Sequence, residues 1–333
     1  MSTVYTTAFP SPRPAVALVG AGAMARVLGL RLSAAGYPVR AVVSRTPGPA
    51  QALAQILGAQ GSDRLGDLPE VPLVVIAVPD DQIAEVADTL TGVARSWAGA
   101  VVLHTSGAVA ASALEPLRAE GARTLSFHPL QSLPPQADAS RLDGVTVGIE
   151  GEAPGVAAGI ELAVGLGLRY VVLSAEAKPR YHLAAAMASN LFVTLMGMVQ
   201  EVLASIDVDR AQAMALVEPL VRGTLDTLVS SSPEEALTGP VARGDLGTLR
   251  AHGLALRKDL PHLVPAYAAL SVETVRLAVR AGTLSPGRAE DVLALMERMV
   301  TMPIPERAAP PSPTPPADER PPAPARGWGT AAG

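Results

Sequence analysis

The chain has 333 residues, which is enough for two domains with separate hydrophobic cores. Hydrophobic residues make up 49% of it and its mean hydropathy is +0.30, which excludes a protein disordered along most of its length. The net charge of −5, without a cluster of Lys and Arg, argues against a nucleic-acid partner, because phosphate binding requires a basic face. The absence of cysteine excludes disulfides, thiolate metal sites and cysteine nucleophiles.

The composition of both ends of the chain predicts that they lack a fixed structure. Residues 1–14 carry neither the basic nor the apolar segment of a signal peptide, so we expect a flexible leader and a cytoplasmic protein. Residues 303–333 contain ten prolines and almost no aliphatic residue, which predicts a disordered, proline-rich tail.

Between residues 15 and 174, short apolar runs alternate with helical stretches. The runs are continuously apolar, which is typical of parallel strands covered by helices on both faces. This alternation predicts the α/β class, with a doubly wound, parallel-sheet Rossmann domain over residues 15–174. The expected strands span 16–19, 39–43, 73–78, 101–103, 124–127, 145–149 and 170–173, and the expected helices 23–35, 49–57, 82–90, 110–120 and 155–166.

The strand pattern stops after residue 174, and residues 175–302 predict an all-helical domain for substrate binding and dimerisation. We expect one long helix over residues 179–206. Its apolar part, 183–199, is interrupted by polar residues and is too short to span a bilayer. We therefore expect a buried helix, no membrane partner, and a homodimer whose second subunit covers this apolar surface. Ser232-Pro233-Glu234-Glu235 and Ser285-Pro286 predict helix starts, and Gly282 predicts a helix end.

A glycine-rich turn follows the first predicted strand. Gly20-Ala21-Gly22-Ala23-Met24-Ala25 has the spacing of the dinucleotide-binding fingerprint, in which backbone amides at a helix start bind a pyrophosphate. Its position between a strand and a helix supports this interpretation over a tight turn without a ligand. We therefore predict that Gly20, Ala21, Gly22, Ala23 and Met24 bind the cofactor.

The second predicted strand ends in Ser44-Arg45-Thr46, where an NAD-binding protein would carry an acidic residue. A guanidinium flanked by two hydroxyls suits the 2′-phosphate of NADP(H), and the alternative is a solvated loop arginine. Cofactor contacts are also expected from two later strand ends, at Val78 and Pro79 and at Thr105, Ser106 and Gly107. The simplest role for Asp80 is a helix N-cap.

Two histidines lie at predicted strand ends that face the ligand in open α/β sheets. For His104 we favour a packed structural role, whereas His128 is equally compatible with a structural and a functional role. At 100° per residue, Lys178, His182 and Ser189 project within roughly 40° of one another, with Asn190 at the edge of this stripe. Such polar groups on an apolar helix are costly unless they meet partners or a ligand. The alternative is a capped, solvent-facing first turn for Lys178 and His182, which explains Ser189 and Asn190 much less well.

A last motif lies in Thr238-Gly239-Pro240-Val241-Ala242-Arg243-Gly244-Asp245. A rigid Gly/Pro turn would hold Arg243 near a helix start capped by Asp245, which suits a substrate carboxylate. The alternative is a connecting loop with an exposed arginine.

Together these motifs resemble the Rossmann-like oxidoreductases whose helical half is domain of unknown function 2520. That family is similar in architecture to ketopantoate reductase, pyrroline-5-carboxylate reductase and the 6-phosphogluconate dehydrogenase superfamily. In those relatives a Lys and an Asn on the first long helix polarise the substrate carbonyl. The resemblance implies these roles for Lys178 and Asn190, or for Lys178 and His182, since the usual spacing is closer than that of Lys178 and Asn190.

The sequence thus supports an NADPH-dependent reductase that transfers hydride to a small C=O or C=N substrate. The substrate is expected to be a carboxylate such as a 2-keto acid, with a ketopantoate-like molecule as one candidate. The predicted catalytic residues are Lys178, His182, Asn190, His128 and Arg243, and no metal is expected. The alternative is a non-catalytic NADP(H)-binding sensor, because the fold by itself does not establish chemistry.

Overall fold

The computed structural model describes residues 13–302, and they fall into two compact units that divide between Thr194 and Leu195. This division lies inside the long helix. The sequence placed the domain boundary before that helix, between residues 174 and 175. The tail predicted for residues 303–333, and all but the last two residues of the leader predicted for 1–14, lie outside the described residues.

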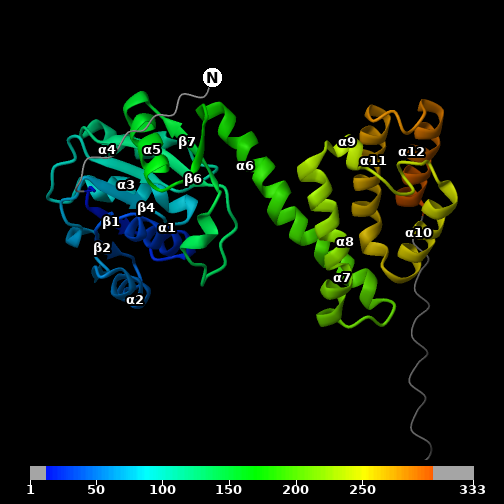
Figure 1. Ribbon diagram of the computed structural model, residues 1–333, viewed down its shortest axis with the longest axis horizontal. Coiled ribbons are helices and arrows are strands. Elements are labelled where there is room, and N and C mark those ends of the chain that lie inside the picture. Colours follow the sequence, from blue (N-terminus) through cyan, green and yellow to red (C-terminus); the bar gives the residue numbers. More distant parts are fainter. Residues whose placement is uncertain (1–12, 303–333) are drawn as a thin grey trace, which may run out of the picture. The chain divides into compact units, whose positions relative to one another are not determined.

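The first unit is built on an eight-stranded sheet with the order β3-β2-β1-β4-β5-β6-β7-β8 (Figure 1). All neighbouring strands are parallel except β6 and β7, which are antiparallel. The strands are β1 (Val16–Val19), β2 (Val39–Val43), β3 (Gln60–Ser62), β4 (Leu73–Ile76), β5 (Val101–His104), β6 (Arg123–Pro129), β7 (Thr146–Gly151) and β8 (Arg169–Val172).

The doubly wound fold is confirmed, and two details differ from the sequence prediction. Strand β3 was not predicted, because Gln60–Ser62 carries no apolar run. The sheet is also not wholly parallel, because no α-helix crosses over between β6 and β7. A loop with one short 3₁₀ turn, η4 (Ala139–Leu142), connects them, so the chain returns in the opposite direction.

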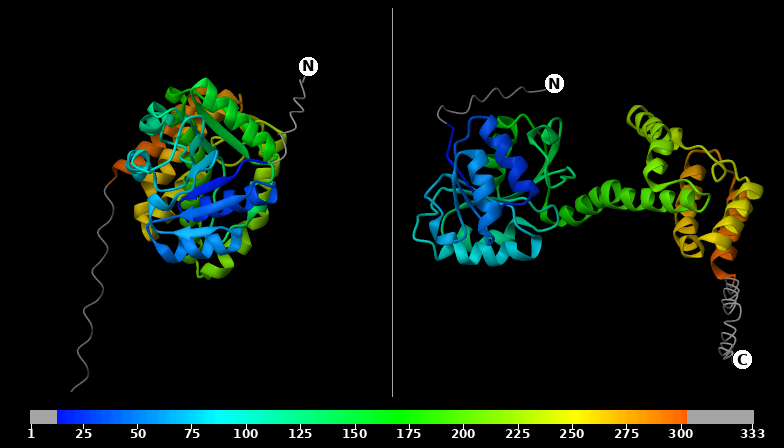
Figure 2. Two further views of the ribbon diagram at one scale, coloured as in Figure 1. Left: turned by 90° about the vertical axis from the view of Figure 1, so that its left-hand side faces the viewer. Right: turned by 90° about the horizontal axis from the view of Figure 1, so that it is seen from below.

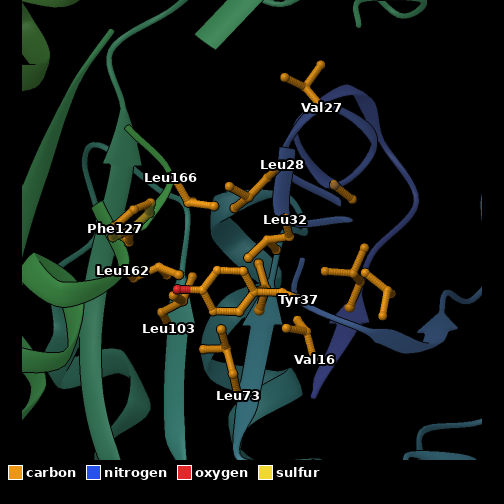
Figure 3. Close-up of a cluster of buried hydrophobic side chains, with 14 of the residues drawn as sticks. Val16, Val27, Leu28, Leu32, Tyr37, Leu73, Leu103, Phe127, Leu162 and Leu166 are labelled. Atoms are coloured by element: carbon orange, nitrogen blue, oxygen red, sulfur yellow. The ribbon is translucent and has the colours of Figure 1, made fainter. Parts of the chain in front are cut away.

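Five helices of this unit cover the two faces of the sheet: α1 (Ala23–Ala34), α2 (Pro47–Leu57), α3 (Ile83–Thr91), α4 (Glu115–Ala119) and α5 (Ala153–Gly165). Apolar residues of α1, α2 and α5 share one buried cluster with the sheet, and those of α3 and α4 share another. Figure 3 shows the first cluster, where Leu32 of α1, Leu103 of β5 and Leu162 of α5 lie around the buried ring of Tyr37. The segment 110–120, predicted as one helix, is a 3₁₀ turn, η3 (Ala111–Leu114), followed by α4.

The long helix consists of α6 (Lys178–Ala186), a π-helical turn η6 (Met187–Leu191) and α7 (Phe192–Ala204). The prediction that this helix is buried is wrong for the single chain, since none of its most apolar 18-residue window is buried. By length and composition, the helical segment Ala175–Ala204 is also long and apolar enough to cross a membrane. The polar residues that interrupt the stretch 183–199 are uncharged. They therefore lower the hydropathy of the helix less than was assumed in the prediction that it is too short to span a bilayer.

The second unit is all-helical, as predicted, with α8 (Arg210–Ser230), α9 (Pro233–Ala236), α10 (Leu246–Asp259), α11 (Val264–Arg280) and α12 (Pro286–Thr301) (Figure 2). A buried cluster from α10, α11 and α12 forms its core. Ser232 forms the predicted capping box with Glu235, and Gly282 ends α11 with a φ of 71°. Ser285 is the N-cap of α12, without a capping hydrogen bond from its side chain.

Candidate active site

The glycine-rich turn connects β1 to α1 at the carboxyl edge of the sheet. Gly20 has a φ of 115°, and a Cβ there would lie 2.1 Å from the Ala77 carbonyl oxygen, so only glycine fits. Gly22 is the N-cap of α1, and a Cβ built on it meets no atom within 4 Å. Open space therefore lies over the start of α1, where backbone amides lack intrahelical partners and can bind an anion.

A cavity of about 500 Å³ opens at this turn, beside the switch point between β1 and β4. Arg45 is exposed at the end of β2 and makes no ion pair with any other residue of the described part of the chain. All of the predicted cofactor-binding residues line the cavity except Ser106 and Gly107: Gly20, Ala21, Gly22, Ala23, Met24, Ser44, Arg45, Thr46, Val78, Pro79 and Thr105.

Ser106 and His104 hold the turn that follows β5. His104 is fully buried, its Nδ1 accepts the Ser106 N–H at 3.2 Å, and its Nε2 lies 3.3 Å from the Ala110 carbonyl. Burial lowers the pKa of His104 from 6.5 to about 4, helped by the charge of Lys178, so the ring is neutral at pH 7. The Ser106 hydroxyl accepts the N–H groups of Ala108 and Val109. This geometry agrees with a structural role for His104.

Asp80 does not cap a helix as the sequence predicted. It lies in the first turn of the 3₁₀ helix η2 (Asp80–Gln82), after Pro79, and its side chain forms no capping hydrogen bond. Its carboxylate instead acts over a distance, since its negative charge raises the pKa values of His128 and Lys178 against the larger effect of burial.

A second cavity, of about 740 Å³, lies beside the long helix within the first unit. Three of the predicted catalytic residues line it: His128 from the end of β6, His182 from α6, and Asn190 from the π-helical turn. The other polar lining residues are Gln131, Ser132, Tyr181 and Ser189. The π-helical turn interrupts the 100° spacing on which the predicted stripe was based, yet Ser189 and Asn190 still share a cavity with His182.

Lys178 does not line this cavity, because its side chain turns inward. The residue is 1% exposed, and its Nζ donates hydrogen bonds to Ser126 Oγ at 2.5 Å and to the Ser106 carbonyl at 3.2 Å. Burial lowers the pKa of Lys178, while the negative charges of Glu150 and Asp80 oppose that shift. The Glu150 carboxylate is itself buried and accepts the Ala111 N–H at 2.7 Å.

Two aromatic neighbours surround His128. Its Nδ1 lies 3.3 Å from the Tyr181 hydroxyl, and the two rings meet edge to face at 88°. The ring centroids of His128 and His182 lie 6.3 Å apart. Burial lowers the pKa of His128 from 6.5 to about 4, with smaller electrostatic contributions from Lys178 and His182. Burial also raises the pKa of Tyr181.

The sequence reading missed Ser126 and Tyr181 as site residues. Both carried a signal: Ser126 is two residues before His128 on one strand, which puts both on one face of the sheet. Tyr181 follows Lys178 by three residues on a helix, so the two lie on neighbouring positions of its surface.

Arg243 belongs to the second unit, where it is exposed, and its catalytic role stays a prediction. The local geometry predicted around it is present. Gly239 has a φ of 104°, and the Asp245 side chain caps α10 by accepting the Thr248 N–H at 3.1 Å.

The strand order, the glycine-rich turn at the carboxyl edge and the helical second unit define a Rossmann-like α/β protein with a C-terminal helical domain. Residues 3–129 match the family model of a Rossmann-like domain, and residues 145–274 match that of domain of unknown function DUF2520. The resemblance expected from the sequence is thereby confirmed. No curated protein matches the chain.

Several solved structures share the fold. A protein of Bacteroides fragilis, provisionally assigned as an NADP oxidoreductase, is 23% identical with a TM-score of 0.67, over 79% of this chain and 98% of its own. An imine reductase of Myxococcus stipitatus in complex with NADP⁺ is 18% identical with a TM-score of 0.52, over 86% and 94%. A pyrroline-5-carboxylate reductase of Coxiella burnetii is 16% identical with a TM-score of 0.52, over 83% and 97%.

Proposed function

We propose that this protein is an NADPH-dependent oxidoreductase that reduces a small C=O or C=N substrate. The observation that carries the proposal is that one turn, the turn after β5, borders both cavities. Thr105 lines the cavity at the glycine-rich turn, and two residues later Gly107 packs against His128 and His182 of the second cavity. The names of the Bacteroides, Myxococcus and Coxiella proteins, which describe NADP oxidoreductase and reductase activities, support the same class.

The residues that line the first cavity match the chemical groups of NADPH. The amides at Gly20–Met24 would hold the pyrophosphate in the space that a side chain at position 22 would fill. Arg45, with the hydroxyls of Ser44 and Thr46, would bind the 2′-phosphate. Val78 and Pro79 would contact the nicotinamide side. When bound there, NADPH would supply the hydride.

The chain's own residues would bind and polarise the substrate. His128, His182 and Asn190 present donors and acceptors to the second cavity, where they would orient the C=O or C=N group. Lys178 would act without lining the cavity, because its buried ammonium group would stabilise negative charge developing on the substrate. Arg243 of the second unit would bind a substrate carboxylate, which favours a 2-keto acid.

We further propose that the active protein is a homodimer in which a second copy covers the long helix. No charged residue lies between His182 and Glu201, and large side chains such as Leu183, Met187 and Val193 are more than half exposed. A bilayer is a poorer partner, because Ser189 and Asn190 place polar groups in the middle of this stretch.

Titration of NADPH and NADH, followed by turnover assays with 2-keto acids, cyclic imines and aldehydes, tests the enzymatic proposal. We expect NADPH to bind more tightly than NADH, and NADPH to be oxidised with at least one of these substrate classes. Tight NADPH binding without turnover across the panel would instead support the nucleotide-binding sensor, and a lack of binding would overturn both.

A further inference from the structure

We infer that Tyr181 is a positioning residue that fixes the tautomer of His128, by donating a hydrogen bond to Nδ1 and leaving the proton on Nε2. The role of that Nε2–H in catalysis rests on the proposed function. The tautomer itself is a property of the free protein and can be measured without a substrate.

The geometry of the pair supports a direct hydrogen bond. His128 is the last residue but one of β6 and Tyr181 lies in the first turn of α6, with 3.3 Å between Nδ1 and the hydroxyl oxygen and 5.6 Å between the ring centroids. Because Nδ1 is engaged by Tyr181, Nε2 is the ring nitrogen left for a ligand in the cavity that His128 lines.

The acid–base strengths of the two groups give the direction of the bond. The phenol O–H, with an ordinary pKa of about 10, is a much stronger acid than the N–H of a neutral imidazole, and the imidazole lone pair is a stronger base than the phenol oxygen. The Tyr181 hydroxyl therefore donates, and His128 Nδ1 accepts across the 3.3 Å between them. A neutral imidazole that accepts at Nδ1 carries its proton on Nε2.

Charged and titratable groups around His128 favour the neutral ring. Lys178 and His182 of α6 and Asp80 of η2 act on its pKa, and the neutral His104 of β5 lies nearby. Burial, Lys178 and His182 outweigh Asp80 and leave the pKa of His128 at about 4. At pH 7 the ring therefore has one proton, and its position on Nδ1 or Nε2 is the open choice that Tyr181 decides.

Two glycines keep both rings in place. A Cβ at Gly107 would lie 2.7 Å from His128 Cε1 and 2.9 Å from its Nδ1, and a Cβ at Gly148 would lie 2.8 Å from the Tyr181 hydroxyl. The backbone thus packs directly on the two groups that form the hydrogen bond. A flipped His128 ring would present a carbon to Tyr181 and lose that bond.

The tautomer deepens the proposed function by selecting a class of substrate. An Nε2–H donor can bind a carbonyl oxygen or the lone pair of a neutral imine, and this bond strengthens as negative charge develops there. A protonated iminium ion has no lone pair to accept the bond. We therefore expect carbonyl compounds to be reduced in preference to preformed iminium ions.

Long-range ¹H–¹⁵N correlation spectra of the free, ¹⁵N-labelled protein at pH 7 test the inference, with the His128 signals assigned through His128→Gln. We expect the wild-type pattern of a neutral ring protonated at Nε2. In Tyr181→Phe the Nδ1–H form should appear, since the donor to Nδ1 is gone. A wild-type ring protonated at Nδ1, or an unchanged ring in Tyr181→Phe, would overturn the inference.

The chain offers a matched control. In the second unit, Tyr267 lies 2.8 Å from Nδ1 of His252 in a similar edge-to-face arrangement. Tyr267→Phe should change the His252 signals and leave those of His128 as in the wild type.

If the wild type turns over no substrate, the proposed function fails while the tautomer result stands. If it does, Tyr181→Phe should lower kcat by about tenfold with unchanged NADPH affinity.

Discussion

Single residues carry the chemistry of this protein, and burial decides what each of them can do. Lys178 and His128 were both predicted as catalytic residues, but Lys178 is buried and does not line the cavity, whereas His128 lines it. Residue identity and spacing placed both near the carboxyl edge of the sheet. The sequence does not show that the Lys178 side chain is buried. The structure shows this, because Nζ packs against Ser106 and Ser126 and donates hydrogen bonds to both.

Replacing Lys178 with Met should lower kcat by about 10²-fold or more, while the melting temperature should fall by only a few degrees as the buried Glu150 carboxylate loses a positive neighbour. The methionine fills a similar volume, and Ser126 Oγ keeps its hydrogen bond to the Ser106 carbonyl. Melting curves, NADPH titration and turnover separate the possible roles. A large loss of stability with little change in kcat would identify Lys178 as a structural residue, and a collapse of NADPH affinity would assign it to the cofactor site.

Arg45→Asp should narrow or reverse the preference for NADPH over NADH. The substitution removes the guanidinium from the cofactor cavity and puts a carboxylate where the 2′-phosphate would lie. Dissociation constants for both cofactors, measured in the wild type and the variant, provide the check. Equal affinity of the wild type for both cofactors would contradict the role assigned to Arg45.

The buried His104 makes stability depend on pH. Its folded-state pKa of about 4 lies below the unfolded value of 6.5, so the unfolded chain binds its proton first as the pH falls. Its contribution is complete above about pH 6.5 and is lost as the pH falls toward 4, by roughly 3 kcal/mol. Melting temperatures from pH 7 to 4.5 should therefore fall more steeply in the wild type than in His104→Gln. Parallel curves would contradict this assignment.

At the scale of elements, caps and periodicity predicted where helices start, but not how a helix is deformed. The capping box at Ser232 and the cap at Asp245 are local hydrogen bonds, which short sequence motifs encode. The π-helical turn at Met187–Leu191 has no such local motif. It changes the direction of Ser189 and Asn190, and such turns are frequent at functional sites.

Two substitutions near the start of α10 should separate the capping role of Asp245 from the proposed ligand-binding role of Arg243. Asp245→Ala should lower the melting temperature by a few degrees, because it removes the hydrogen bonds to the N–H and hydroxyl of Thr248. Arg243→Lys should leave the melting temperature unchanged and raise KM for an acidic substrate several-fold, since a point charge does not reproduce the planar fork. Unchanged KM together with a lower melting temperature would make Arg243 structural.

At the scale of the whole molecule, the exposed apolar surface supports the proposed homodimer. The long helix and the edge strand β8, where Tyr170, Val171 and Val172 are exposed, present large side chains to solvent in the single chain. Contiguous exposed apolar surface marks an interaction site or an aggregation liability. The proposed second copy covers it without placing polar residues in lipid.

Analytical ultracentrifugation should find the wild type as a dimer and Val193→Glu as a monomer. Val193 is 68% exposed, so its substitution should leave the fold of the single chain intact. Ile56→Glu is the matched control, because Ile56 is also exposed but lies on α2, away from the long helix. A wild-type monomer, or a protein that sediments only with lipid vesicles, would contradict the dimer.

The sequence by itself determined the features that depend on short-range patterns. Apolar runs predicted seven of the eight strands, the spacing of Gly20 and Gly22 predicted the tight turn before α1, and local caps predicted helix starts. The tertiary structure decided the antiparallel return of β7, the exposure of the long helix and the inward turn of Lys178. It also brought Tyr181 to His128 across 53 residues of sequence. These outcomes depend on which groups distant segments bring into contact and shield from water, and no local pattern records that.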